Sequence, residues 1–208
     1  MGENVVLVYL VVCFFVFLAG FVDSIAGGGG LISLPAYMIA GLPVHTAIAT
    51  NKMSSSMGTF VASFHYMKKG FMKWKICIPA VFGAIAGSWI GSHLALLISE
   101  KALKIAMLVV LPVILFYVLR SKALKGKDEN ATEVINGMLI FKSILIAAVV
   151  GIYDGIYGPG TGTFLMLLFT GFCHMTLNDA AGATKAINLT TNITALIVFL
   201  INGNVLLP

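Results

Sequence analysis

One short pattern is written twice in this chain, and it constrains the fold more than any other feature. The first copy, GFVDSIAGGGG, covers residues 20–30, and the second, GIYDGIYGPGTG, covers residues 151–162. Each copy places one aspartate, Asp23 or Asp154, at the end of an apolar run, and a glycine cluster and another apolar run follow. Glycine clusters interrupt helices, and carboxylates are rare in apolar segments. A duplicated unit with a broken helix and an intramembrane charge is how many secondary transporters are built.

The composition places this pattern in a membrane. Hydrophobic residues make up 59% of the chain and charged residues only 10%, whereas soluble domains carry about 25% charged residues. The first apolar run has no lysine or arginine before it and is long enough to cross a bilayer, so it is not a typical signal peptide. We predict an integral membrane protein whose first helix spans the bilayer.

Long and short apolar segments alternate along the chain. The short segment 31–40 contains Pro35 and, at about 1.5 Å per residue, reaches only about half of the hydrocarbon core. It predicts a half-helix or a re-entrant helix, and the segment 163–172 repeats it. The remaining apolar segments predict transmembrane helices at residues 5–26, 44–66, 76–98, 103–119, 138–157 and 177–201.

The order of these segments predicts an all-α, polytopic protein with two repeated halves, each containing a short broken helix. The first membrane repeat covers residues 1–120, a polar cytoplasmic linker covers 121–136, and the second repeat covers 137–208. The second repeat stops at the place that corresponds to the loop before segment 76–98. We therefore expect the second half to be incomplete, as in a fragment or a truncated product.

The basic residues predict the orientation of the helices. Eight of the thirteen lie in two clusters between apolar segments, as in cytoplasmic loops. The loop after segment 44–66 has four lysines and its counterpart, 202–206, has none, which favours halves inserted upside down relative to each other. If the short segments are re-entrant, the halves are parallel instead. The clusters consist of Lys68, Lys69, Lys73 and Lys75, and of Arg120, Lys122, Lys125 and Lys127.

Asp23 and Asp154 are candidates for proton coupling. A carboxylate inside a bilayer is unfavourable unless it is paired, hydrated or protonated, so such residues indicate function. The alternative is a structural hydrogen bond from the carboxylate to the backbone amides of the glycine turn that follows.

The glycine clusters are candidates for an anion site. A helix that begins after a glycine turn directs free N–H groups and its positive dipole end at that turn. The alternative is close helix packing through small residues, but two copies beside an aspartate favour a site. The candidate substrate-binding glycines are Gly27, Gly28, Gly29 and Gly30 in the first half, and Gly158, Gly160 and Gly162 in the second.

A single lysine lies in each of two apolar segments, Lys52 in the first half and Lys185 in the second. An ammonium group with hydroxyl and amide groups nearby suits an oxyanion such as sulfite, sulfate or a sulfonate. Snorkelling to the interface and pairing with Asp23 or Asp154 are the alternatives. The neighbouring candidates for substrate binding are Asn51, Ser55, Thr184 and Asn188.

Other kinds of site have little support in the sequence. The three cysteines and four histidines are scattered, which argues against a metal site, a disulfide or a cofactor. The glycine run at 27–30 has neither the ending of a phosphate-binding loop nor a preceding strand. With no catalytic constellation, an intramembrane enzyme ranks low, and the clustered positive charge indicates topology rather than nucleic-acid binding.

At residues 20–32, at Thr50-Asn51-Lys52 and at residues 151–162, the chain resembles the TauE/SafE family of sulfite exporters and organosulfur-anion permeases. The resemblance extends over nearly the whole chain. It implies a multi-pass inner-membrane protein that moves small, often sulfur-containing anions with the proton gradient. It also implies a full-length second half, whereas we expect the second half here to be incomplete.

These observations lead to one functional prediction. We expect a secondary transporter of a small inorganic or organosulfur anion, coupled to protons, with the anion between the two halves. The alternatives are a passive anion channel and a non-transporting membrane scaffold. The expected partners are the anion and the lipid bilayer, and the sequence leaves the oligomeric state and the direction of transport open.

Overall fold

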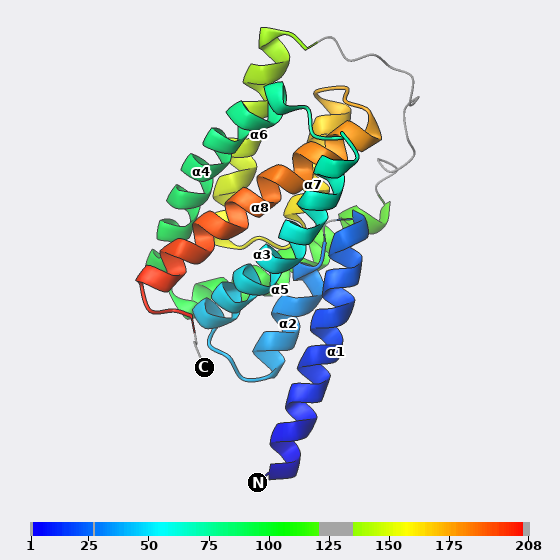
Figure 1. Cartoon of the computed structure of the whole chain (residues 1–208). Coiled ribbons are helices and arrows are strands. Elements are labelled where there is room, and N and C mark those ends of the chain that lie inside the picture. Colours follow the sequence, from blue (N-terminus) through cyan, green and yellow to red (C-terminus); the bar gives the residue numbers. More distant parts are fainter. Residues whose placement is uncertain (1, 27, 121–134, 206–208) are drawn as a thin grey trace.

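The computed structural model describes residues 2–26, 28–120 and 135–205, and these residues form helices and no strand. The predicted all-α fold is therefore confirmed (Figure 1). The helices are α1 (Gly2–Ala26), α2 (Gly30–Ile39), α3 (Val44–Lys68), α4 (Trp74–Leu97), α5 (Glu100–Arg120), α6 (Gly137–Ile156), α7 (Thr161–Gly171) and α8 (Leu177–Ile201).

Four of the described helices are long and apolar enough to cross a membrane: α1, α4, α6 and α8. The predicted short segments form α2 and α7, of 10 and 11 residues. The predicted spans 44–66 and 103–119 form α3 and α5, which are not among these four. On α3 the buried side chains are largely polar and include Asn51, Lys52 and Thr59, so this helix is much less apolar than the others.

The order of a long, a short and a long helix occurs twice, as α1–α2–α3 and as α6–α7–α8. This agrees with the repeat seen in the sequence, but the equivalence of the two halves and their relative orientation remain predictions. Of the predicted linker, the structure describes only residues 135 and 136. The second of these, Asn136, caps α6 by accepting a hydrogen bond from the Leu139 amide at 2.8 Å.

The most extensive helix contact joins α4 to α6. A Cβ atom placed on Gly87 would lie 2.1 Å from the Ala148 carbonyl oxygen, and one on Gly91 would lie 2.1 Å from that of Ile152. Gly83 faces the carbonyl of Ile144 in the same way, one turn earlier. Glycines at four-residue spacing thus let the two backbones touch, which is how helices associate tightly in membranes.

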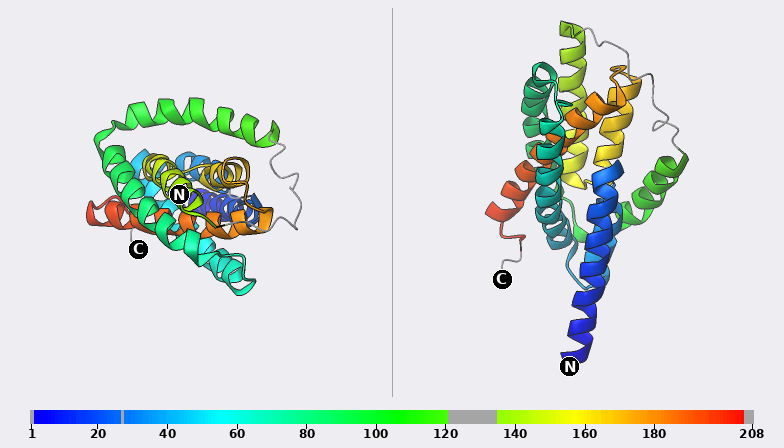
Figure 2. Two further views of the ribbon diagram at one scale, coloured as in Figure 1. Left: turned by 90° about the horizontal axis from the view of Figure 1, so that it is seen from above. Right: turned by 45° about the vertical axis from the view of Figure 1, so that its right-hand side comes forward.

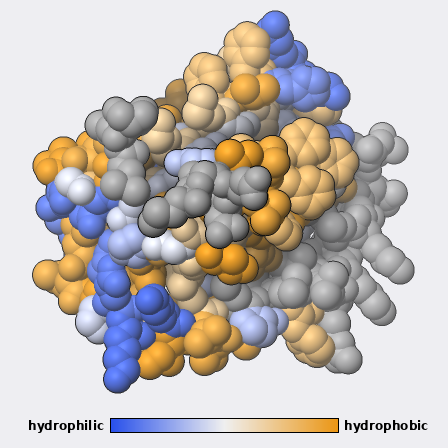
Figure 3. All heavy atoms as spheres, turned by 90° about the horizontal axis from the view of Figure 1, so that it is seen from below, coloured by the Kyte–Doolittle hydropathy of each residue, from blue (hydrophilic) through white to orange (hydrophobic). Residues whose placement is uncertain are grey.

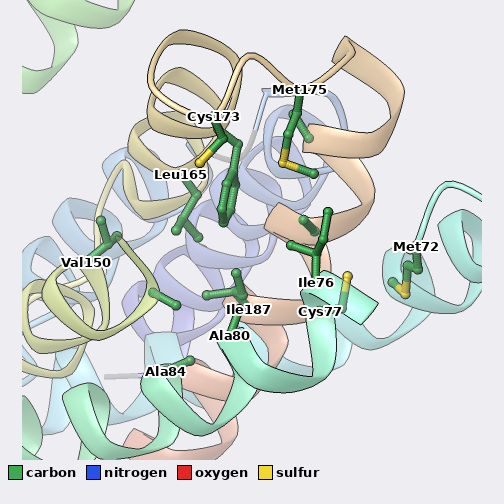
Figure 4. Packing of buried hydrophobic residues seen from close by; sticks show 14 of the residues in the cluster. Met72, Ile76, Cys77, Ala80, Ala84, Val150, Leu165, Cys173, Met175 and Ile187 are labelled. Carbon is green, nitrogen blue, oxygen red and sulfur yellow. The ribbon is translucent and has the colours of Figure 1, made fainter. Parts of the chain in front are cut away.

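A buried apolar cluster joins α4, α6, α7 and α8 (Figure 4). Ile76, Leu165 and Ile187 from three of these helices meet in it and are fully buried. A second cluster around Leu34, Ile48 and Phe199 joins α2, α3 and α8. The two clusters hold α8 against both halves of the chain.

The outer helices contact the bundle much less. Figure 2 shows much of α5 lying apart from the main group of helices, although Leu103 and Met107 of its first turns are buried in the second cluster, and α1 extends beyond that group at its N-terminal end. Phe14, Phe17 and Phe21 form an exposed face on α1. Apolar residues also cover much of the surface shown in Figure 3, and hydrophilic residues gather at its edges. Exposed apolar side chains of this size suit contact with lipid rather than with water.

Candidate functional site

The two interrupted helices meet where each is broken. The first break lies between α1 and α2, and the second, at residues 157–160, lies between α6 and α7. Gly158 and Gly160 have positive φ values of 95° and 82°, which a residue with a side chain rarely adopts. A Cβ atom on Gly30 would lie 3.2 Å from Cα of Pro159. The predicted glycine clusters therefore pack against each other across the two halves.

A buried ion pair links α3 to α6 beside these breaks. Lys52 Nζ lies 2.7 Å from Asp154 Oδ2, and the two side chains are 1% and 2% exposed. Lys52 Nζ also donates a hydrogen bond to Asn192 Oδ1 of α8 at 3.3 Å. The lysine of the first half is thus neutralised by the aspartate of the second half.

The reciprocal pair is looser. Lys185 Nζ of α8 lies 4.0 Å from Asp23 Oδ2 of α1, with side-chain exposures of 4% and 18%. The same ammonium donates a hydrogen bond to the backbone carbonyl of Asp23 at 2.5 Å. Each lysine therefore pairs with the aspartate of the other half, so pairing accounts for these charges better than snorkelling does. Such a pair is favourable inside a membrane only when both partners are present.

Both aspartates also hold the turn that follows them. Asp23 Oδ1 accepts a hydrogen bond from the Gly29 amide at 3.2 Å, and Asp154 Oδ1 accepts one from the Thr161 hydroxyl at 2.6 Å. The structural hydrogen bond to the glycine turn, considered above as an alternative, is thus present at Asp23. At Asp154 the donor is a threonine side chain. Each carboxylate therefore takes part in an ion pair and also accepts a hydrogen bond that stabilises the helix break.

A small polar cavity lies where these groups converge. Its free space is about that of one water molecule. The first residues of α2 and α7 line it, so two helix N-termini add partial positive charge to a cavity lined by one lysine and two aspartates. The lining residues are Asp23, Gly30, Asn51, Lys52, Ser55, Asp154, Gly158, Gly160, Thr161, Gly162, Asn188 and Asn192.

Most of the predicted site residues lie on this cavity, and a few do not. Lys185 approaches it only through Asp23, and Thr184 lies buried beside Lys185 with a hydroxyl for which the described residues provide no hydrogen-bond partner. Gly28 and Gly29 belong to the first turn rather than to the cavity lining, and Gly27 lies outside the described residues.

Sequence reasoning did not select two of the lining residues, Thr161 and Asn192. Thr161 begins α7, where a hydroxyl can reach the preceding carboxylate. Asn192 follows Lys185 by seven residues, which is two helical turns, so both occupy one face of α8. The seven-residue spacing from Lys185 could therefore have identified Asn192 from the sequence. Asn51 is held in place by the Ser33 hydroxyl of α2, which donates to Asn51 Oδ1 at 2.5 Å.

Within the described part of the chain, no cluster of histidine, cysteine or acidic residues has the arrangement of a metal site. The three cysteines are free thiols: Cys13 is exposed, and Cys77 and Cys173 are buried.

Comparison with known proteins identifies the family. Residues 12–208 match the family described as "Sulfite exporter TauE/SafE". The chain is 34% identical over 190 residues to "Probable membrane transporter protein ORF9" of Sinorhizobium sp, covering 91% of this chain and 71% of that protein. It is 34% identical over 200 residues to "Probable membrane transporter protein YfcA" of Escherichia coli K12, covering 94% and 71%. A Haemophilus influenzae protein described as "Probable membrane transporter protein" is 31% identical over 194 residues, covering 91% and 73%.

No solved structure matches the chain. The sequence matches and the membrane-spanning helices agree with each other, and they make this a multi-pass protein of the cell membrane. The chain belongs to the TauE/SafE sulfite exporter family, which is a family of membrane transporters and not of enzymes.

Proposed function

We propose that this chain is a proton-coupled permease for a small inorganic or organosulfur anion such as sulfite or a sulfonate. The observation that carries the proposal is a pair of buried lysines, each of which forms an ion pair with the aspartate of the other half. Both aspartates line a cavity that the N-termini of α2 and α7 also line. The family's description as sulfite exporters supports the substrate class.

The balance of charges supports proton coupling. The site contains two ammonium groups and two carboxylates, so its formal charge is zero. An anion that enters alone would place excess negative charge in a buried site, which is unfavourable. A monovalent anion that enters while one aspartate takes up a proton leaves the formal charge unchanged, and a divalent anion requires protonation of both aspartates. The anion then replaces the carboxylate as the partner of Lys52 or Lys185.

The polar lining supports an oxyanion as the substrate. Asn51, Asn188 and Asn192 carry amide groups and Ser55 a hydroxyl, and all four line the same cavity as Lys52. Oxyanions accept several hydrogen bonds, and those from charged donors are the strongest. The first residues of α2 and α7 add backbone amides to this set of donors.

The size of the cavity favours a carrier over a channel. Space for about one water molecule does not admit sulfite, so the site in this conformation is too small for the substrate. Because the site lies between α1–α3 and α6–α8, movement of one half against the other would open it, as in alternating access. In this proposal the halves are residues 1–120 and 137–208, inserted in opposite orientations and joined by the cytoplasmic linker 121–136.

The test is anion uptake by proteoliposomes that contain the purified chain, with sulfite, sulfate and methanesulfonate as separate substrates. The test variant combines Lys52→Ala with Lys185→Ala. The matched control is Lys142→Ala, because Lys142 lies on α6 away from the cavity and donates a hydrogen bond to the Phe172 carbonyl at 3.4 Å. We expect saturable uptake in the wild type and in the control, and none in the double variant.

The same vesicles separate the alternatives. Uptake that an inward proton gradient accelerates, and that Asp23→Asn uncouples from the gradient, supports the carrier. Flux far faster than a carrier's turnover and indifferent to the proton gradient indicates a channel. Unchanged uptake in a well-folded double variant refutes the assignment of the site, and no uptake of any of the three anions by folded wild-type protein favours the scaffold.

A further inference from the structure

Three asparagines line the inner cavity, and the oxygen of each side-chain amide already accepts a hydrogen bond. Asn51 Oδ1 accepts one from the Ser33 hydroxyl at 2.5 Å. Asn188 Oδ1 accepts one from Asn192 Nδ2 at 3.2 Å. Asn192 Oδ1 accepts one from Lys52 Nζ at 3.3 Å. These bonds leave the NH₂ groups of Asn51 and Asn188 to face a ligand.

The ammonium group of Lys52 fixes the orientation of two of these amides. An ammonium group can only donate hydrogen bonds, so Asn192 must turn its oxygen toward Lys52. The NH₂ group of Asn192 then points to Asn188, which lies one helical turn earlier on α8 and must present its own oxygen. The NH₂ group of Asn188 is thereby directed away from Asn192. The two amides form a row that starts at Lys52 and ends in a hydrogen-bond donor.

The Ser33 hydroxyl fixes the orientation of Asn51. The separation of 2.5 Å is typical of an O–H···O bond and too short for an N–H···O bond, so the amide oxygen faces the serine. The amide nitrogen lies beside the N-terminus of α2, because a Cβ atom on Gly30 would be 3.4 Å from it. Gly30 lines the cavity, so this NH₂ group also lies at the cavity wall.

The carboxylates of the site are engaged as well. Asp154 Oδ1 accepts a hydrogen bond from a hydroxyl, and Oδ2 contacts an ammonium group. Asp23 Oδ1 accepts one from a backbone amide, and Oδ2 lies 4.0 Å from an ammonium group. Among the side chains of the lining, the hydroxyl oxygens of Ser55 and Thr161 can still accept a hydrogen bond. The lining is therefore rich in donors and poor in acceptors that lack a donor.

We infer that Ser33 and Asn192 are positioning residues of the site. They hold the amides of Asn51 and Asn188 with the NH₂ groups toward the ligand, so that the site selects oxyanions that carry no proton. A sulfonate has only acceptor oxygens and suits such a lining. A singly charged phosphonate carries one hydroxyl, which would face donors, and a buried donor without a partner weakens binding by about 5–150-fold. The inference rests on the proposed function, to which it adds a selectivity.

The experiment compares methanesulfonate with methylphosphonate. At mildly acidic pH the two anions have the same shape and the same single charge, and they differ by one hydroxyl proton. The affinity of the purified chain in detergent for each anion is measured by isothermal titration calorimetry at one pH. We expect the wild type to bind methanesulfonate at least about fivefold more tightly than methylphosphonate.

Two variants test the positioning residues. Ser33→Ala frees the Asn51 amide to turn its oxygen toward the ligand. Asn192→Asp keeps the shape and the acceptor for Lys52 but offers no donor to Asn188, which can then turn its oxygen toward the ligand. We expect the preference for methanesulfonate to shrink severalfold in both variants. The added charge of Asn192→Asp acts equally on two anions of equal charge, so the ratio of the two affinities reports the amide alone.

Two further variants serve as controls, and we expect both to keep the preference of the wild type. Ser33→Thr retains the hydroxyl. Ser143→Ala removes a buried serine hydroxyl that donates to the Leu139 carbonyl of its own helix, away from the cavity.

The outcomes separate this inference from the proposed function. Saturable binding of both anions to the wild type with equal affinity would overturn the inference and leave the proposed function standing. A wild-type preference that persists in folded Ser33→Ala and Asn192→Asp would overturn the role of the two positioning residues. Absence of binding of either anion to folded wild-type protein would contradict the proposed function itself, and the selectivity with it.

Discussion

Removing the charge of Asp154 is expected to destabilise the protein more than removing that of Asp23. Asp154→Asn keeps the shape of the side chain but leaves the ammonium of Lys52 fully buried without its counter-charge. Breaking one side of a buried pair in this way costs about 3–5 kcal/mol. Asp23→Asn acts on a pair that is wider and partly exposed, with its lysine also bonded to a backbone carbonyl.

The distances give the order of the two effects. At an effective dielectric constant of about 20, unit charges attract by about 6 kcal/mol at the 2.7 Å of the Lys52–Asp154 pair and by about 4 kcal/mol at the 4.0 Å of the Lys185–Asp23 pair. Exposure of Asp23 weakens the second value further through solvent screening. For a chain of this size, a loss of about 3–5 kcal/mol lowers the melting temperature by roughly 6–20 °C.

The assay is thermal unfolding of the purified protein in one detergent, followed by tryptophan fluorescence and by loss of the monodisperse peak in size-exclusion chromatography. We expect the melting temperature to fall more for Asp154→Asn than for Asp23→Asn. Combining Asp154→Asn with Lys52→Met removes both charges and is expected to recover most of the loss. Equal shifts for the two single variants, or a double variant as unstable as Asp154→Asn, would refute the reasoning.

Two further predictions concern the glycines. Gly87→Ala is expected to destabilise the protein by at least about 1–3 kcal/mol, because the new Cβ meets an α6 carbonyl oxygen at 2.1 Å; Gly171→Ala, with open space around it, serves as the control in the same unfolding assay. Gly158→Ala is expected to weaken anion binding, because its Cβ would lie 2.7 Å from Lys52 Nζ. Gly41→Ala serves as the control, because Gly41 has a similar positive φ of 89° and a Cβ atom there would have nothing within 4 Å. This variant therefore introduces the backbone strain without the contact to Lys52. Equal loss of binding in both variants would contradict a contact-specific effect.

Features that depend on local chemistry were predictable from the sequence. The helix breaks followed from Gly27–Gly30 and from Gly158-Pro159-Gly160, and the short helices α2 and α7 followed from the length of the apolar segments after them. The convergence of most candidate residues on one cavity also agrees with the duplicated pattern, although their role in binding remains a proposal.

Features that depend on how the helices pack were not predictable. The sequence left open whether Lys52 pairs with an aspartate, and only the crossing of α3, α6 and α8 selects Asp154 as its partner, 102 residues away. The polar character of α3 has the same origin, because its side chains Asn51, Lys52 and Ser55 line the site. The contact between α4 and α6 did leave a signal, the four-residue spacing of Gly83, Gly87 and Gly91, which sequence reasoning did not use.

The central claim is that an anion displaces a carboxylate from a buried lysine while that carboxylate takes up a proton. The most direct test is to add methanesulfonate, which brings no proton of its own at neutral pH, to purified protein in weakly buffered detergent solution with a pH indicator. We expect the solution to become more alkaline in proportion to the anion bound, and we expect Asp23→Asn combined with Asp154→Asn to abolish this proton uptake. Saturable binding of the anion with no change in pH would contradict the claim.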